Sequence, residues 1–133
     1  MKRTPGAVLS ARALLILLAA LAAFHVLVLA RVLPSSAVWG GRALDPGSNV
    51  AQLEWVALVV TVLFWGIVAV RAGIAKALGL RRVSRLGTWV MFAYFVLNIV
   101  GNLASESSLE KAVFTPLSVV LAACAFVLAV TRD

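Results

Sequence analysis

Apolar residues are grouped along the chain in four long blocks, which cover approximately residues 13–33, 53–70, 86–103 and 112–131. A helix needs about 20 residues to cross the roughly 30 Å of hydrocarbon in a bilayer, and each block is close to that length. None of the blocks alternates polar with apolar residues, as membrane-spanning strands would. The pattern therefore predicts four transmembrane helices.

The blocks are joined by connections of about 8 to 19 residues, which favour antiparallel neighbours in an up-down bundle. Composition supports this fold, because 63% of the residues are hydrophobic, 13% are charged and the mean hydropathy is +1.07. Such values exclude an ordinary water-soluble domain. The predicted fold is an all-α membrane protein, an antiparallel four-helix bundle in which residues 1–133 form a single membrane domain.

The first block has two features of a cleaved signal peptide, since basic residues precede it and the small residues 35–37 follow it. An apolar run of about 20 residues is longer than the usual 7 to 15 of a signal peptide core. We therefore expect this block to remain as a membrane helix.

The lysines and arginines alternate between the two sides of the predicted bundle. Nine of the twelve belong to one side, namely Lys2, Arg3, Arg12, Arg71, Lys76, Arg81, Arg82, Arg85 and Arg132, and Arg31, Arg42 and Lys111 belong to the other. Because positively charged connections stay on the cytoplasmic side, this distribution predicts that both termini are cytoplasmic. The basic connection from Arg71 to Arg85 is also expected to attract anionic lipids of the bilayer at that face. A nucleic-acid partner is excluded, because binding it would need a basic soluble domain.

The four tryptophans lie near the predicted membrane boundaries, with Trp39 and Trp55 on the outer side and Trp65 and Trp89 on the inner side. Amphipathic rings at this depth are typical interfacial anchors. For Trp39 and Trp55, stacking against a ligand is a secondary alternative.

Small residues predict where the helices pack, because helices in lipid associate where their backbones approach closely. The clearest stripe, in the fourth block, is Ser118, Ala122, Ala125 and Ala129. A similar face in the first block is Ala19, Ala23 and Ala30, and Gly66 is the candidate in the second.

Most familiar chemical motifs are missing from the sequence. Cys124 is the single cysteine, so a disulfide within the chain is excluded. The single histidine leaves no metal-ligand spacing, and no phosphate-binding loop or nucleophile elbow is found. We expect no metal or cofactor, and the sequence assigns no catalytic residue.

Polar residues gather instead toward the outer side of the predicted bundle. The candidate ligand-binding residues are His25, Arg42, Glu54, Asn98 and Asn102. Asn98 and Asn102 are four apart and share a helix face, and His25 is expected about 12 Å below the outer boundary. Polar side chains at membrane depth need partners, so we expect Glu54 to lie within reach of Arg42 or an asparagine.

Two interpretations of this cluster remain open. Asn and His often form structural hydrogen bonds between helices, and a Glu near a helix start is an ordinary feature. The alternative is a small outward-facing polar pocket that binds a ligand headgroup or relays protons through His25, since imidazole exchanges protons near neutral pH.

Several short motifs resemble a family of small bacterial membrane proteins with four helices, whose activity is uncharacterised. The motifs are Val38-Trp39-Gly40-Gly41-Arg42, Asn98, Gly101-Asn102, Leu109-Glu110-Lys111 and Phe114-Thr115-Pro116. The resemblance covers nearly the whole chain and implies a multi-pass protein of the bacterial inner membrane. It carries no activity over to this chain.

Three functional classes remain. A small transporter of the four-helix multidrug type would carry a carboxylate deep in the first helix, where this chain has His25, and would have balanced loop charges. A membrane enzyme acting on a hydrophobic substrate would have His25 and Glu54 as its acid-base pair. An accessory protein would pack against copies of itself or against another membrane protein. We favour a non-catalytic role over an enzymatic one, with a pocket for a small or lipid-like ligand at the polar cluster as the functional hypothesis.

Overall fold

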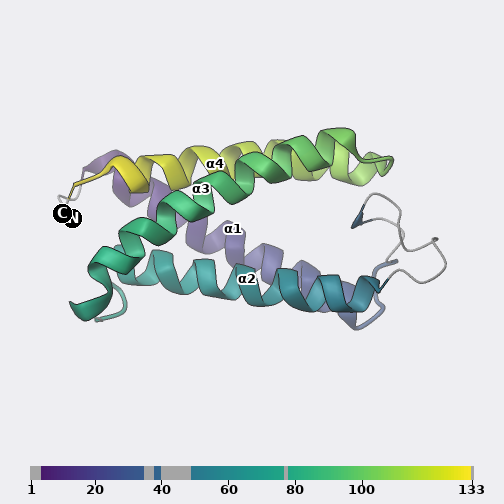
Figure 1. Cartoon of the computed structure of the whole chain (residues 1–133), viewed down its shortest axis with the longest axis horizontal. Helices are drawn as coiled ribbons and strands as arrows, with labels where there is room; N and C mark the ends of the chain where they lie inside the picture. Colours follow the sequence, from purple (N-terminus) through teal and green to yellow (C-terminus); the bar gives the residue numbers. More distant parts are fainter. Residues whose placement is uncertain (1–3, 35–37, 40–48, 77, 133) are drawn as a thin grey trace.

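The computed structural model describes residues 4–34, 38–39, 49–76 and 78–132 and is helical throughout its regular elements. Its elements in chain order are α1 (Pro5–Leu29), α2 (Val50–Arg71), the 3-10 helix η3 (Leu78–Leu80), α3 (Arg81–Ala104), the π-helix η4 (Glu110–Phe114) and α4 (Thr115–Val130). The spans Pro5–Leu29, Val50–Arg71, Arg81–Ala104 and Glu110–Val130 are each long and apolar enough to cross a membrane. The prediction of four transmembrane helices in a bundle is confirmed at this level (Figure 1).

The first helix is displaced toward the N-terminus relative to the predicted residues 13–33. It begins at Pro5, where the side chain of Thr4 accepts a hydrogen bond from the backbone N–H of Ala7 at 3.3 Å. It ends at Leu29, because Arg31 adopts a left-handed φ of 60° and the N–H of Val32 bonds to the carbonyl of Leu27 at 2.9 Å. Hydrophobicity alone could not show this turn, since the apolar residues continue beyond it.

This earlier end changes the depth of His25. The residue lies four positions before the last residue of α1, which is about 6 Å along the helix axis. The predicted depth of about 12 Å was counted along a helix that continues to Leu33, whereas α1 ends at Leu29. His25 lies about one turn from the end of the helix.

The second and third helices are also longer than their apolar blocks. Helix α2 ends at Arg71, followed by Gly73 with a φ of 76° and a bond from the N–H of Ile74 to the carbonyl of Ala69 at 2.9 Å. Glycine adopts this conformation without the steric cost that other residues incur. Helix α3 begins at Arg81, five residues before the predicted boundary, so part of the basic connection is helical.

A widened turn precedes α4. In η4 the N–H of Thr115 bonds to the carbonyl of Glu110, five residues earlier. Pro116 follows directly, and its ring lacks an N–H and would collide with the carbonyl four residues earlier in a regular helix. Pro116 lies in the first turn of α4, and the π-turn accommodates it.

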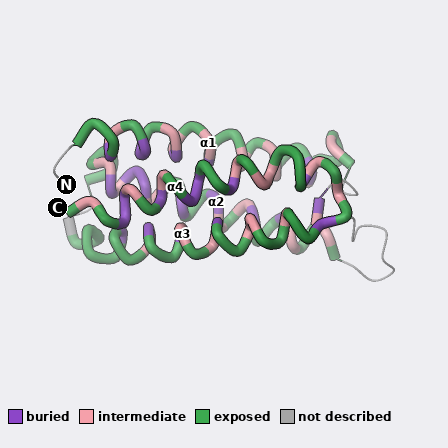
Figure 2. The backbone as a smooth tube through the Cα atoms, turned by 90° about the horizontal axis from the view of Figure 1, so that it is seen from above, coloured by how far each residue is buried: buried purple, intermediate pink, exposed green. Residues whose placement is uncertain are grey.

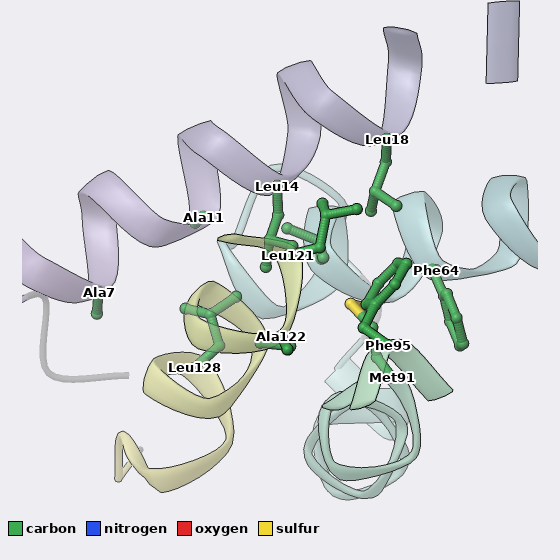
Figure 3. Close-up of a cluster of buried hydrophobic side chains, with 12 residues drawn as sticks. Ala7, Ala11, Leu14, Leu18, Phe64, Met91, Phe95, Leu121, Ala122 and Leu128 are labelled. Atoms are coloured by element: carbon green, nitrogen blue, oxygen red, sulfur yellow. The ribbon is translucent and has the colours of Figure 1, made fainter. Parts of the chain in front are cut away.

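The buried core follows one stripe of each helix (Figures 2 and 3). The predicted stripe of α4 is confirmed, because Ser118, Ala122, Ala125 and Ala129 are all buried. The predicted stripe of α1 is wrong, because Ala19, Ala23 and Ala30 are exposed. Helix α1 instead buries Ala7, Ala11, Leu14 and Leu18, the last two of which fill the centre of the core. Alanine spacing alone does not show which face meets the neighbouring helices.

Close packing between α2 and α3 depends on Gly87 rather than on Gly66. A Cβ atom added at Gly87 would lie 2.8 Å from Cδ1 of Ile67, whereas one added at Gly66 would meet nothing within 4 Å. The absence of a side chain at Gly87 therefore allows Ile67 to pack directly against α3.

The outward surface of the bundle is apolar. In the most apolar 18-residue stretch of each of the four spans, only 17% to 33% of the residues are buried. Large side chains such as Leu63, Leu97 and Val100 are exposed along the helices. This surface matches a hydrocarbon environment, which indicates a multi-pass membrane protein. The start of α1 and the end of α4 lie at the same end of the bundle (Figure 1).

Candidate functional site

Glu54 lies at the centre of the candidate site. It is the fifth residue of α2, whose start is capped by the side chain of Asn49, accepting from the N–H of Gln52 at 3.0 Å. This register puts Glu54 on the same inward face as Ala57 and Thr61. Only 1% of Glu54 is exposed, so its carboxylate depends on protein partners.

Both carboxylate oxygens of Glu54 have a partner from another part of the chain. Oε2 lies 2.7 Å from Nδ1 of His25 on α1, and Oε1 accepts a hydrogen bond from Nε1 of Trp39 at 2.5 Å. An ionised carboxylate only accepts hydrogen bonds, so in that form Nδ1 of His25 carries the hydrogen. The three residues connect α1, α2 and the segment between them, and we call them the outer triad after the side of the membrane that the basic residues predict for them.

Trp39 reaches Glu54 from an unusual backbone conformation. Its φ is 57°, in the left-handed region that costs a non-glycine residue about 1–2 kcal/mol. The preceding residue, Val38, is buried. The bond to Glu54 and the burial of Val38 offset this cost and hold the pair of residues against the bundle.

One aromatic ring, that of Phe24, lies against His25. Phe24 meets the imidazole ring edge-on at 5.9 Å between ring centroids, and it meets Phe114 of η4 at 4.9 Å. The π-turn before Pro116 therefore brings Phe114 to α1 beside the outer triad. His25 keeps 12% of its side chain exposed, more than Glu54 does.

The two asparagines do not join the outer triad. Nδ2 of Asn102 donates to Oγ of Ser118 at 3.2 Å, a bond that connects α3 to α4. Asn98 is half-buried. Glu54 thus pairs with His25 and Trp39 rather than with an asparagine. Arg42, the remaining candidate, lies outside the described residues.

Glu110 has a structural role that its sequence spacing could have shown. Ser107-Ser108-Leu109-Glu110 has the spacing of a capping box, and Oγ of Ser107 accepts from the N–H of Glu110 at 3.4 Å. The Glu110 carboxylate also accepts a hydrogen bond from Oγ of Ser105. These contacts close the connection between α3 and α4.

Sequence reasoning did not identify the buried hydrogen bonds of two residues, Trp39 and Arg71. The sequence predicts that Trp39 is a membrane anchor. Its position between His25 and Glu54 in the chain is the one sequence feature that connects it with these two residues. Arg71 is expected to be one of several cytoplasmic charges, yet it is buried and its Nη2 donates to the carbonyls of Leu128 at 3.1 Å and Thr131 at 2.5 Å. No sequence signal separates Arg71 from the other arginines.

The outer triad provides a carboxylate paired with an imidazole. Such a pair can accept or donate a proton at the other ring nitrogen, Nε2, while the carboxylate orients the ring. Among the described residues no group of three or more His, Cys, Asp or Glu side chains could hold a metal ion. His25 and Glu54 can form hydrogen bonds and exchange protons at this position.

No protein family model, curated protein or solved structure matches this chain significantly. The resemblance to a family of small bacterial membrane proteins therefore stays a prediction.

Proposed function

We propose that this chain is a multi-pass protein of the bacterial inner membrane that binds a small or lipid-like ligand at the outer end of its bundle, through His25 and Glu54. In this proposal the helices are antiparallel and both termini are cytoplasmic, as the distribution of basic residues favours. The observation that carries the ligand site is the buried carboxylate of Glu54, bonded on both oxygens by His25 and Trp39.

Burial of the Glu54 carboxylate costs free energy. Removing an ion from water costs several kcal/mol, and apolar residues of similar volume often stabilise a buried position as well or better. Ionisable groups in membrane segments are therefore more often associated with function than with stability. The outer triad fits this description, because an apolar triad could join the same three segments.

Exposure and hydrogen bonding assign different roles to Glu54 and His25. Glu54 is enclosed and has both oxygens engaged, so it positions the imidazole rather than contacting a ligand. Nε2 of His25 has no hydrogen-bond partner among the described residues, and this side chain is the more exposed of the two. Nε2 is thus the atom that meets a ligand group, such as a hydroxyl, ammonium or phosphate.

Two substitutions of His25 separate binding from structural support. Asparagine places an amide N–H near the position of Nδ1, so His25→Asn keeps a donor for Glu54 but removes Nε2. His25→Phe removes both and leaves a buried carboxylate without this partner, which should cost about 3–5 kcal/mol. We expect His25→Asn to unfold in detergent near the wild-type temperature, whereas His25→Phe unfolds at a clearly lower one.

The ligand readout uses amphiphiles with hydroxyl, ammonium or phosphate headgroups on one acyl chain. We expect one headgroup class to raise the unfolding temperature of the wild type, and His25→Asn to lose that increase. If no headgroup class shifts the wild type, or if His25→Asn responds equally, the ligand site is refuted. A transporter or an enzyme built on the same pair would instead show uptake or turnover of the stabilising amphiphile.

The orientation has its own test. In a Cys124→Ala background, single cysteines replace the exposed residues Glu106 and Gly79, which lie at opposite ends of the bundle. A membrane-impermeant maleimide added to intact cells should label Glu106→Cys at once and Gly79→Cys only after permeabilisation. The reverse pattern would show that the termini are outside.

A further inference from the structure

The end of the bundle at which α1 begins and α4 ends is strongly basic. Its exposed cationic side chains are Lys76, Arg81, Arg82, Arg85 and Arg132, and Arg12 lies nearby on α1. The three acidic residues in the described part of the chain, Glu54, Glu106 and Glu110, all lie at the opposite end. The described residues therefore provide no carboxylate to balance these cations.

Three of these cations, Arg81, Arg82 and Arg85, are concentrated in the opening turns of α3. Arg81 and Arg85 are four residues apart and Arg82 and Arg85 three apart, so all three occupy one side of the helix. The first turn of α3 contains no acidic residue, and no side chain caps it. Positive charges repel one another here and also oppose the positive end of the helix dipole, so an external anion would be favourable.

The neighbouring polar residues show that the three arginines face outward. The buried hydroxyls of Ser84 and Thr88 donate to the carbonyls of Arg81 and Arg85 at 2.8 and 2.7 Å, on the inward face of α3. Arg71, by contrast, turns inward and donates to carbonyls at the end of α4. The protein thus supplies acceptors to Arg71 but, among the described residues, none to the guanidinium groups of the α3 arginines.

An exposed apolar track continues from the arginines along α3. Leu86 is 66% exposed and Leu97 is 71% exposed. Val90, which lies between them in the sequence, is exposed as well. Trp89 follows Arg85 by one turn and is also exposed. Cations at the helix start, an amphipathic ring next to them and a hydrocarbon surface beyond match the polar-to-apolar order of a phospholipid.

We propose that Arg81, Arg82 and Arg85 form a binding site for the phosphate-containing headgroup of an anionic phospholipid, whose acyl chains lie along Leu86, Val90 and Leu97. Guanidinium groups bind phosphate oxygens in a bidentate manner, which gives arginine an advantage over lysine at such a site. This site lies at the opposite end of the bundle from the outer triad and does not depend on it.

The test is a titration of the purified full-length protein in detergent with phosphatidylglycerol, with bound lipid counted by native mass spectrometry. The site variant carries Arg81→Gln, Arg82→Gln and Arg85→Gln. The matched control carries Arg12→Gln, Lys76→Gln and Arg132→Gln, which removes the same charge from the same end. A basic residue that contacts the lipid headgroup changes affinity for anionic lipid about fivefold, so the site variant should bind about 100-fold more weakly. The control should lose clearly less.

A second variant with lysine at all three α3 positions keeps the charge and removes bidentate bonding. It should bind phosphatidylglycerol with an affinity between those of the wild type and the glutamine variant. If the glutamine variant fails to fold, comparison of the lysine variant with the wild type still tests the site. Phosphatidylcholine with the same acyl chains should bind equally weakly to all variants.

Three results would overturn the proposal. Equal losses in the site variant and the control would show that only the overall charge attracts lipid. Affinity for phosphatidylglycerol in the lysine variant equal to that of the wild type would exclude the bidentate site. Displacement of the lipid by inorganic phosphate at millimolar concentration would identify a free-anion site instead.

Discussion

Substitution of Arg71 by methionine tests how a single arginine joins two membrane helices. Methionine keeps an unbranched apolar stem of similar length and removes the guanidinium group. In the wild type, Nη2 donates to the carbonyl of Leu128 at 3.1 Å and to that of Thr131 at 2.5 Å. Helix α4 ends at Val130, so carbonyls near this end lack partners within the helix.

The expected magnitude follows from these contacts. A hydrogen bond to a charged group contributes about 1.5–3 kcal/mol, and a cation at a helix C-terminus adds about 0.3–1 kcal/mol. The substitution also removes the cost of burying a guanidinium group, which offsets part of the loss. We therefore expect Arg71→Met to lower the free energy of unfolding by about 2–4 kcal/mol.

The matched control is Lys76→Met, at an exposed position of the same basic connection. Exposed substitutions away from such contacts usually change stability by less than about 0.5 kcal/mol. Both variants can be compared with the wild type by reversible unfolding in mixed micelles of a mild and a denaturing detergent. Equal free energies of unfolding for the two variants would refute the assignment of Arg71 to the end of α4.

Two further predictions concern helix packing and use the same assay. Gly87→Ala places a Cβ atom 2.8 Å from Cδ1 of Ile67 and should cost about 1–3 kcal/mol, whereas Gly101→Ala meets nothing within 4 Å and should gain up to about 1 kcal/mol from helix propensity. A stabilising effect of both substitutions would contradict the close approach of α2 and α3. Ala125→Leu, at a position with no exposed area, should cost about 1–3 kcal/mol, whereas Val120→Leu, at one that is 46% exposed, should change stability by less than about 0.5 kcal/mol. Similar losses at both positions would contradict the buried face of α4.

The site was only partly accessible to sequence reasoning. Polar side chains at membrane depth are rare enough to stand out, so His25 and Glu54 were identifiable as candidates. The direct bond between His25 and Glu54 could not be predicted. The two residues are 29 positions apart and meet only because of the way α1 and α2 pack against each other. For the same reason Asn102 could be placed on a helix face with Asn98, but its bond to Ser118 could not be foreseen.

Helix count and approximate position were determined by the sequence itself, because long apolar blocks must bond their own backbone in lipid whatever their neighbours are. The stripe of small residues on α4 was also readable, since regular spacing at steps of four and three defines one face. The ends of the helices depended on backbone geometry, such as the left-handed Arg31 after α1 and the π-turn before Pro116.

Only the tertiary structure decided which of several chemically equal residues became buried partners. Arg71 and Arg82 both belong to the basic connection, yet Arg71 reaches the carbonyls of α4 and Arg82 remains exposed. Ala19 and Ala11 are equally suited to close packing, yet only Ala11 lies in the core. Such choices depend on helix rotation and on contacts between segments distant in the chain, and neither composition nor local spacing contains that information.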